Sequence, residues 1–449
     1  MKRIAKVVFG SVLISSLILN PYSINFEKLG INKNLNVSAE TDTHSFVFVT
    51  KDKEIKKNLK NVINTKSLDE LDEKVDVSVE DLSQISDLEN NKKLNEAKDI
   101  AFNIKDVNKD ENIKKYLNNS LKKGKRIFLY GDQLTNNDFK ASIKLEKMTI
   151  NDTLNGKPAT VIFGDNQDYI KEKGYLKKVN TGNDKKNEST NIIGYTLDDS
   201  QELQYISNNI TFYNEDGSQS DEIPEEIYFE ELLFLQSEIE KKEEKANKLE
   251  EEYDNSTASI LTTSKVKAKS TRVLDKYGYY GTARNNIEVL GRVDTDYELY
   301  KQNSDSSSIY DYFSVKPKTQ LTEYGSGQSA AIWQDIDIPY DVDELKDWSP
   351  YGDKNGISFN IALVSPFNLD WKLEWKDSTF MDDLSSLGLD YARWDVRDGD
   401  LSGQVFNPGA GWASKGRQAV CTIRSKGTFH VQTYTYVADT GAINVRYSY

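Results

Sequence analysis

The hydrophobic pattern of the N-terminal part alternates between strand and helix periods. Residues 44–50 (HSFVFVT) form a short apolar run, residues 51–64 carry apolar side chains at helical spacing, and residues 74–80 (KVDVSVE) alternate polar and apolar positions. Residues 112–123 are amphipathic at helical spacing, and they lead into the apolar run 125–130 (KRIFLY). These periods predict strands and helices in succession, which indicates a small α/β domain over residues 40–222.

The longest helical pattern begins at Pro224. Glu225 and Glu226 follow it, in the first turn, where the helix macrodipole favours acidic side chains. Apolar residues then recur at spacings of three and four, but residues 238–252 are almost wholly charged. The pattern predicts a charged helix over residues 223–254 and favours a solvated spacer over a strong dimer zipper. We therefore expect a monomer, or a weak dimer through residues 225–253.

The pattern changes again beyond this helix. Residues 255–271 are rich in Ser, Thr and Lys and lack aromatic residues, which indicates a linker. From residue 272 onward the chain shows short alternating runs separated by Gly and Pro. Residues 357–375 predict a half-buried hairpin, and residues 418–449 predict a three-stranded meander with a turn at Ser425-Lys426-Gly427. About eight strands are expected here, which predicts an antiparallel β-sandwich over residues 272–449.

The predicted class is thus an α+β multidomain protein: a small α/β domain, a charged spacer helix and a C-terminal antiparallel β-sandwich. All six tryptophans lie in the last 120 residues. Because large aromatic side chains dominate core and recognition energetics, we expect residues 272–449 to fold independently and to carry recognition.

The N-terminus resembles an export signal. Lys2, Arg3 and Lys6 precede the apolar run 7–19, and a small-residue site, residues 37–39 (VSA), follows. This arrangement predicts a signal peptide over residues 1–39 and a secreted protein. The apolar run is short for a membrane-spanning helix, although an uncleaved anchor is the alternative.

The charge of the chain excludes some partners. The formal net charge is −14, and removal of residues 1–39 takes away five basic residues and one acidic residue, which makes the chain more negative still. Such a charge repels nucleic acid and anionic lipid at long range, so we expect no nucleic-acid partner. Cys421 is the single cysteine, and therefore no internal disulfide can form.

Catalytic motifs are absent from the sequence. His44 and His430 are its two histidines, and no H-E-x-x-H, G-x-S-x-G, S-x-x-K or Walker A pattern occurs. The sequence therefore predicts a protein that is not an enzyme. A glycoside hydrolase remains the open alternative, since carboxylate pairs are available in any acidic chain.

One acidic turn could hold a metal ion. Asp395, Asp398 and Asp400 lie together in the segment DVRDGD. Turn carboxylates that cap backbone amides explain this composition, and calcium binding is the alternative. No other cofactor is expected.

Aromatic side chains beside Gly, Asp and Asn carry the binding hypothesis. This composition, in predicted loops, is typical of sugar- and peptide-binding surfaces, while the alternative is that the rings fill a core. The expected partner is an extracellular carbohydrate or a protein surface. The candidate ligand-binding residues are Tyr277, Tyr279, Tyr280, Tyr310, Tyr312 and Trp412.

A second function remains open. Residues 256–269 alternate small or apolar with polar residues and are rich in Ser, Thr and Lys, as the stem of a β-barrel pore would be. A stem needs two such strands in a hairpin, and one is found. The alternative to a binding protein is therefore a secreted β-pore-forming toxin or cytolysin.

Overall fold

The computed structural model describes most of the chain beyond residue 43. The predicted signal peptide and the possible stem, residues 256–269, lie outside the described residues. The described residues are 44–51, 75–134, 150–152, 157–159, 190–197, 203–255, 270–274, 277–302, 309–340, 343–352, 354–355, 359–362, 370–373, 380–397, 401–415 and 418–448.

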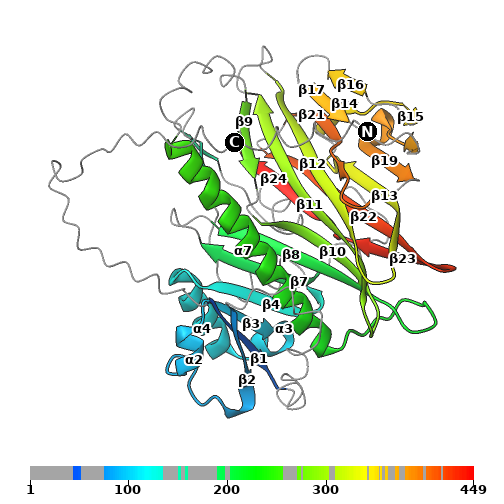
Figure 1. The fold of residues 1–449 in the computed structure, drawn as a ribbon. Helices are drawn as coiled ribbons and strands as arrows, with labels where there is room; N and C mark the ends of the chain where they lie inside the picture. Colours follow the sequence, from blue (N-terminus) through cyan, green and yellow to red (C-terminus); the bar gives the residue numbers. More distant parts are fainter. Residues whose placement is uncertain are drawn as a thin grey trace, which may run out of the picture. The chain divides into compact units, whose positions relative to one another are not determined.

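The larger sheet has thirteen strands and runs through both halves of the sequence (Figure 1). β20 (Val405–Phe406) and β9 (Ser270–Leu274) are attached beside its main path, to the strands β12 and β11 respectively. In order across the sheet, the path consists of β14 (Asp343–Ser349), β21 (Gly409–Ser414), β12 (Asp311–Glu323), β11 (Val289–Gln302), β10 (Gly278–Arg284), β8 (Leu203–Phe212), β7 (Thr190–Leu197), β4 (Arg126–Leu134), β3 (Asp99–Asn103), β1 (His44–Thr50) and β2 (Val75–Asp81).

The N-terminal strands are buried on both faces. β2, β1, β3 and β4 pair in parallel. Phe46 and Phe48 of β1 pack with the long helix on one face, while Val47 and Val49 belong to the core on the opposite face. Near-continuous apolar runs such as HSFVFVT suit this double burial. The second face is covered by the short helices α2 (Lys92–Glu96), α3 (Ile104–Val107) and α4 (Glu111–Lys122), preceded by a 3-10 turn, Leu82–Gln84.

Helix α7 (Glu225–Asn255) lies across the sheet and connects its two halves. It follows β8 and leads through β9 to β10, and β8 pairs in parallel with β10. Leu232, Leu235 and Ile239 of this helix are fully buried against the sheet. In this structure these side chains are therefore not available for the predicted helix–helix seam, and the first half of the helix is a buried crossover instead of a solvated spacer.

A buried charge cluster fixes α7 to the strands. The fully buried Glu231 carboxylate accepts hydrogen bonds from Arg284 at 3.2 Å and Arg292 at 3.1 Å. Asn208 and Thr282 donate to the same carboxylate at 2.9 and 3.0 Å. Burial alone would raise the pKa of Glu231, but the two guanidinium groups outweigh it and hold the pKa below its usual value.

The smaller main sheet has seven strands and shares a hydrophobic core with the larger one. A 3-10 turn, Leu387–Leu389, lies in the connection between its strands β18 and β19. Two further hairpins are formed by β5 (Ile150–Asp152) with β6 (Lys157–Ala159) and by β16 (Phe359–Ala362) with β17 (Asp370–Leu373). The seven strands are β15 (Lys354–Asn355), β18 (Phe380–Asp383), β19 (Tyr391–Arg397), β13 (Gln328–Asp337), β22 (Gln418–Val431), β23 (Tyr434–Asp439) and, paired to β22, β24 (Ile443–Ser448).

Glycines lie at places where the two sheets approach each other closely. A Cβ atom on Gly281 would lie 2.4 Å from the backbone carbonyl carbon of Asp439, and one on Gly427 would lie 2.5 Å from Leu321. The predicted turn at residues 425–427 is therefore wrong. β22 runs straight through Gly427, which is needed for close approach between the sheets, and the chain turns after Val431.

The expected β-rich α+β class is confirmed, with few helices and several sheets. The predicted hairpin over residues 357–375 is also present, since Phe359 of β16 pairs with Leu373 of β17. The boundary expected near residue 272 is crossed by the large sheet, because β8 and β10 are direct neighbours. None of the described helices is long and apolar enough to cross a membrane.

Candidate functional site

Four of the six predicted binding rings lie in the interior. Tyr277, Tyr279, Tyr280 and Trp412 are all buried, with at most 4% of any of them exposed. Tyr279 and Tyr280 belong to β10 and Trp412 belongs to β21, so the prediction that these three lie in loops is wrong. The glycines beside them permit close packing between sheets. As placed, these rings present no face to a ligand.

Two of the buried rings, Tyr277 and Tyr280, contact α7. The Tyr277 hydroxyl donates to Glu243 of the helix at 2.7 Å, and burial together with this carboxylate raises the pKa of Tyr277. The Lys242 ammonium lies 5.4 Å from the centroid of the Tyr280 ring. These contacts combine apolar burial with a cation–π interaction, which explains their position without a ligand.

Tyr310 and Tyr312 are the two predicted rings that remain partly accessible. Tyr310 directly precedes β12, and Tyr312 pairs with Ala413 of β21. The Lys346 ammonium lies 6.0 Å from the Tyr310 ring centroid. These two rings therefore lie at the start of β12, whereas Tyr279 and Tyr280 belong to β10.

The predicted acidic turn is described only at its first carboxylate. Asp395 is half-buried at the end of β19, and Arg397 lies 3.3 Å from its carboxylate. Burial raises the pKa of Asp395. Asp398 and Asp400 lie outside the described residues. Within the part of the chain that the structure describes, no group of His, Cys, Asp and Glu is arranged to hold a metal ion.

A cluster of exposed apolar side chains lies in and beside the β18–β19 connection. Leu387 and Leu389, of the 3-10 turn, are 53% and 68% exposed, and Tyr351 after β14 is 64% exposed. Among the described residues, five of the nine large apolar side chains that are exposed belong to this cluster. We call it the apolar ridge, and its members are Tyr351, Phe380, Leu384, Leu387 and Leu389.

The backbone under the apolar ridge is held by hydrogen bonds. The Asp383 carboxylate accepts from the Trp348 indole at 2.9 Å, from the Gly352 N–H at 2.7 Å and from the Ser385 N–H at 3.1 Å. The first two of these bonds join β14 and the residues after it to the end of β18. Leu384 also donates its N–H to the Arg393 carbonyl at 2.9 Å. The leucines are thus displayed on a fixed scaffold, which is what a binding surface needs.

The sequence contains a weak signal for this ridge. Residues 384–389 (LSSLGL) place three leucines among serines and a glycine, and they follow neither the strand nor the helix period. Apolar residues without a period have no sheet or helix face on which to be buried. The binding prediction was based on aromatic rings, which lie in other segments. Exposed leucines offer a similar apolar area to a partner.

A polar cleft of about 550 Å³ lies where β8 passes β23. Its charged groups pair with each other: the Arg424 guanidinium contacts the Asp439 carboxylate at 2.6 and 2.9 Å. Asn209 donates its side-chain amide to the Asp439 carbonyl at 2.9 Å. Burial lowers the pKa of Lys426, whose ammonium lies 4.7 Å from the Trp333 ring centroid. These contacts therefore hold the two sheets together at the cleft.

Comparisons with known proteins find no family. No family model matches the chain, and no curated protein matches it. Solved structures of pore-forming proteins resemble part of it at low TM-scores. A protein titled "Pore forming protein" has a TM-score of 0.24 and 8% identity, covering 39% of this chain and 90% of its own.

Two toxins of Clostridium perfringens give similar results. The delta-toxin has a TM-score of 0.22 and 9% identity, covering 38% of this chain and 86% of its own. The NetB toxin in its membrane-inserted form has a TM-score of 0.18 and 7% identity, covering 40% of this chain and 94% of its own. Likenesses of this size assign neither a fold nor an activity to this chain.

Proposed function

We propose that this chain is an exported, non-enzymatic protein that attaches to membranes with zwitterionic headgroups through the apolar ridge. The observation that carries the proposal is the display of five large apolar side chains on two segments that are joined by hydrogen bonds to Asp383. Contiguous exposed apolar surface is uncommon on soluble proteins, and it marks interaction sites where it occurs. Residues 272–449, proposed to form a β-sandwich, supply this surface.

The area of the ridge is suited to reversible attachment. Its side chains are between 43% and 68% exposed, so about half of each is still available for burial. Full burial of such a side chain is worth about 1.5–3 kcal/mol, which leaves about 1 kcal/mol for each of the five. A sum of about 5 kcal/mol corresponds to a dissociation constant on the order of 0.2 mM.

The composition of the ridge favours lipid over a protein partner. Three of its five members are leucines, and leucine is under-represented at protein–protein hot spots, where Trp, Tyr and Arg dominate. Leu and Phe are among the side chains that interfacial segments bury at the boundary between headgroups and acyl chains, and Tyr is enriched at the same depth. The net charge of −14 repels anionic lipid, and therefore a neutral, zwitterionic surface is preferred.

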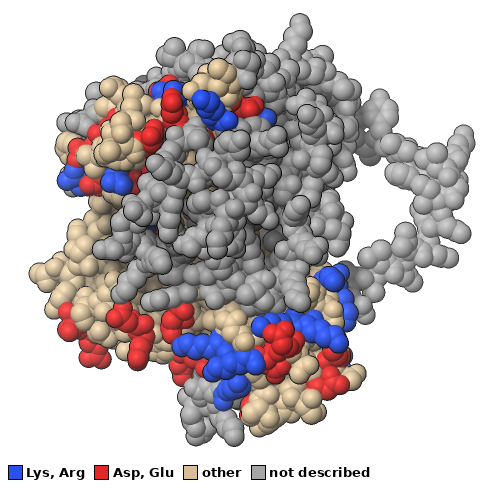
Figure 2. Space-filling model, turned by 180° about the vertical axis from the view of Figure 1, so that it is seen from behind, with Lys and Arg blue, Asp and Glu red and all other residues tan. Residues whose placement is uncertain are grey.

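The surface charge agrees with this preference. Figure 2 shows Lys and Arg side chains beside Asp and Glu on the lower part of the described surface, where Figure 1 places α2 and α4. Contacts there include Lys93 with Glu80 at 2.7 Å and Lys114 with Glu111 at 2.5 Å. Mixed charges of this kind make a poor electrostatic site for nucleic acid or anionic lipid.

The test is sedimentation of the mature protein with phosphatidylcholine vesicles. We expect weak, reversible binding that changes little with salt, because the ridge acts through apolar burial. The triple variant Leu384→Ser, Leu387→Ser, Leu389→Ser removes about 3 kcal/mol and should weaken binding roughly 100-fold. Ile287→Ser, at a side chain that is 84% exposed in a different turn, is the matched control and should bind normally.

Dye release from the same vesicles separates attachment from the alternative function. A surface-binding protein leaves the vesicles sealed. Rapid leakage with detergent-resistant oligomers would replace this proposal with that of a β-pore-forming protein. If vesicles do not bind while an immobilised carbohydrate or cell-surface protein does, and the triple variant abolishes that binding, then the ridge recognises a different class of partner.

A further inference from the structure

The order of the parallel strands creates a crevice at one edge of the sheet. β1 lies between β2 and β3, and the chain leaves β1 toward β2 but leaves β3 toward β4. The connections after β1 and β3 thus run in opposite directions. In open α/β sheets, such a switch point opens a crevice at the carboxyl ends of the two strands, where small ligands bind.

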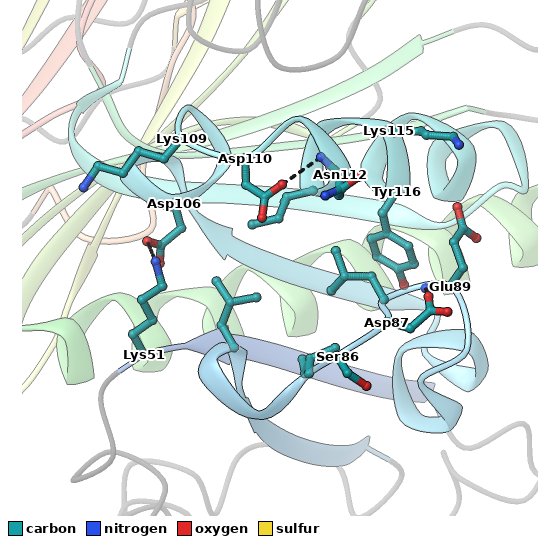
Figure 3. A pocket seen from close by; sticks show the side chains of 14 residues that line it. Lys51, Ser86, Asp87, Glu89, Asp106, Lys109, Asp110, Asn112, Lys115 and Tyr116 are labelled. Atoms are coloured by element: carbon teal, nitrogen blue, oxygen red, sulfur yellow. Dashed lines mark hydrogen bonds and ion pairs between the residues drawn. The ribbon is translucent and has the colours of Figure 1, made fainter.

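A cavity of about 650 Å³ lies at this place (Figure 3). Lys51 directly follows β1, and the residues from Asp106 to Tyr116 belong to the connection after β3. Residues 82–89, which follow β2, form the opposite wall. Topology and cavity therefore indicate the same site independently, and a cavity of this size holds a small organic ligand.

The two ends of this crevice differ in charge. Figure 3 places Lys51, Asp106 and Lys109 at one end. Lys51 pairs with Asp106, while Lys109 is exposed and has no ion-pair partner among the described residues. This end therefore has one cation available for a ligand.

The opposite end offers a carboxylate. Asp87 and Glu89 lie there with Lys115 (Figure 3). Asp87 accepts hydrogen bonds from the Asn90 side chain at 2.6 Å and from the Glu89 N–H at 2.9 Å. The bond from Asn90 lowers the pKa of Asp87, so its carboxylate stays charged at neutral pH. Glu89 lies 3.9 Å from the Lys123 ammonium, so Asp87 is the carboxylate at this end that has no ion-pair partner among the described residues.

Between the two ends, the lining combines aliphatic and polar side chains. Leu82, Ile85 and Ile113 contribute aliphatic surface. Asp110, above the middle of the crevice, accepts the Asn112 N–H at 2.8 Å and caps helix α4, so its charge is opposed by the helix dipole. Glu89 accepts a hydrogen bond from the Asn119 side chain at 2.8 Å. Helix α4 rises about 13 Å between residues 110 and 119.

We propose that this crevice binds a short zwitterionic peptide of three or four residues, with its ammonium group at Asp87 and its carboxylate at Lys109. An extended peptide spans at most about 3.3–3.6 Å per residue, so three or four residues extend over roughly 10–14 Å. A peptide of this length fits a cavity of about 650 Å³. Apolar side chains of the peptide would pack on Leu82, Ile85 and Ile113. This site is independent of the apolar ridge and of membrane attachment.

Calorimetric titration of the full mature chain with the tripeptide Leu-Ala-Leu tests the proposal. The free tripeptide should bind, and its N-acetylated and C-amidated forms should each bind at least tenfold more weakly, because each loses one end charge. Equal affinity for all three forms, or no heat up to millimolar concentration, would overturn the proposal.

Two tryptophan variants in one loop test the location. Ser86 is exposed and lines the crevice, so Ser86→Trp should fill it and abolish tripeptide binding. Gln84 is exposed in the same loop but does not line the crevice, so Gln84→Trp should bind normally. Both variants should still sediment with vesicles. Unchanged tripeptide affinity in Ser86→Trp would place the peptide elsewhere and contradict the proposal.

Discussion

At the scale of single residues, the attachment of α7 depends on the side chain of Glu231. Its buried carboxylate is shared by two arginines, and the Arg292 guanidinium also lies 3.6 Å from the Phe234 ring centroid. A buried pair of this kind adds little net stability over apolar packing. Removal of one partner, however, leaves uncompensated charges in the interior.

We therefore expect Glu231→Ala to lower the free energy of unfolding by about 3–5 kcal/mol, measured by urea denaturation. Glu230→Ala is the matched control. Its carboxylate contacts Arg284 at 2.8 Å but is partly exposed, so the loss should stay below about 1 kcal/mol. Equal losses in the two variants would show that the buried cluster has no special role.

The buried carboxyl group of Asp343 should make the free energy of unfolding depend on pH. Burial raises the pKa of this carboxyl to about 7, although Ser414 and the Val420 N–H oppose the shift. The folded state then binds a proton that the unfolded state, with its carboxyl near pH 4, does not bind at intermediate pH. Stability from this group is therefore highest at low pH, and it falls as pH rises from about 4 to 7.

Thermal unfolding between pH 5 and pH 8 should show this decline. Burial also raises the pKa of Asp294 and Asp337 to about 6, which adds to the slope in the same direction. Asp343→Asn removes one titrating group and should flatten the profile, by roughly 3 kcal/mol over the whole window. A variant profile parallel to that of the parent would contradict this assignment.

At the scale of elements, the sequence predicted strands and helices well where a strict period was present. Residues 44–50 form β1, and residues 112–123 correspond to α4 (Glu111–Lys122). The errors arose at glycines. Gly281 and Gly427 resemble turn residues in the sequence, but their lack of a side chain serves the approach of a strand from the other sheet. That approach is a long-range property that no local pattern records.

Gly281→Ala tests this explanation. The new Cβ would meet the backbone of Asp439 at 2.4 Å, and backbone cannot move aside as a flexible side chain can. We expect a loss of about 3 kcal/mol or more in the free energy of unfolding. Gly388→Ala is the control, because no atom lies within 4 Å of the position that its new methyl group would take. A neutral Gly281→Ala would mean that the sheets can separate at this crossing.

At the scale of the whole molecule, the site was less predictable than the fold. Tyr280 and Trp412 were predicted to bind a ligand, but both rings are buried in the core. The apolar ridge depends on Asp383 joining two segments that are about 30 residues apart in the sequence. The switch-point crevice depends on strand order. Neither relation can be derived from local periodicity, because both depend on contacts between distant residues.

The parallel pairing of β8 with β10 also affects whether residues 272–449 can fold on their own. A fragment of residues 272–449 loses β8 and α7, which exposes Tyr280 and leaves Arg284 and Arg292 without Glu231. In contrast to the expectation from tryptophan content, we expect this fragment to unfold at least 10 °C below the full chain, or to aggregate. Circular dichroism during heating measures this directly. A fragment as stable as the full chain would show that the join contributes little.

The same join has a consequence in time. About 65 residues separate the end of β8 at Phe212 from the start of β10 at Gly278. At a synthesis rate of about 5–20 residues per second, the edge of β8 stays unpaired for roughly 3–13 s before β10 is synthesised. An unpaired edge strand is a template for wrong partners during that interval. The nascent chain is therefore most vulnerable to aggregation just before β10 emerges, and a chaperone that shields β8 would be most useful then.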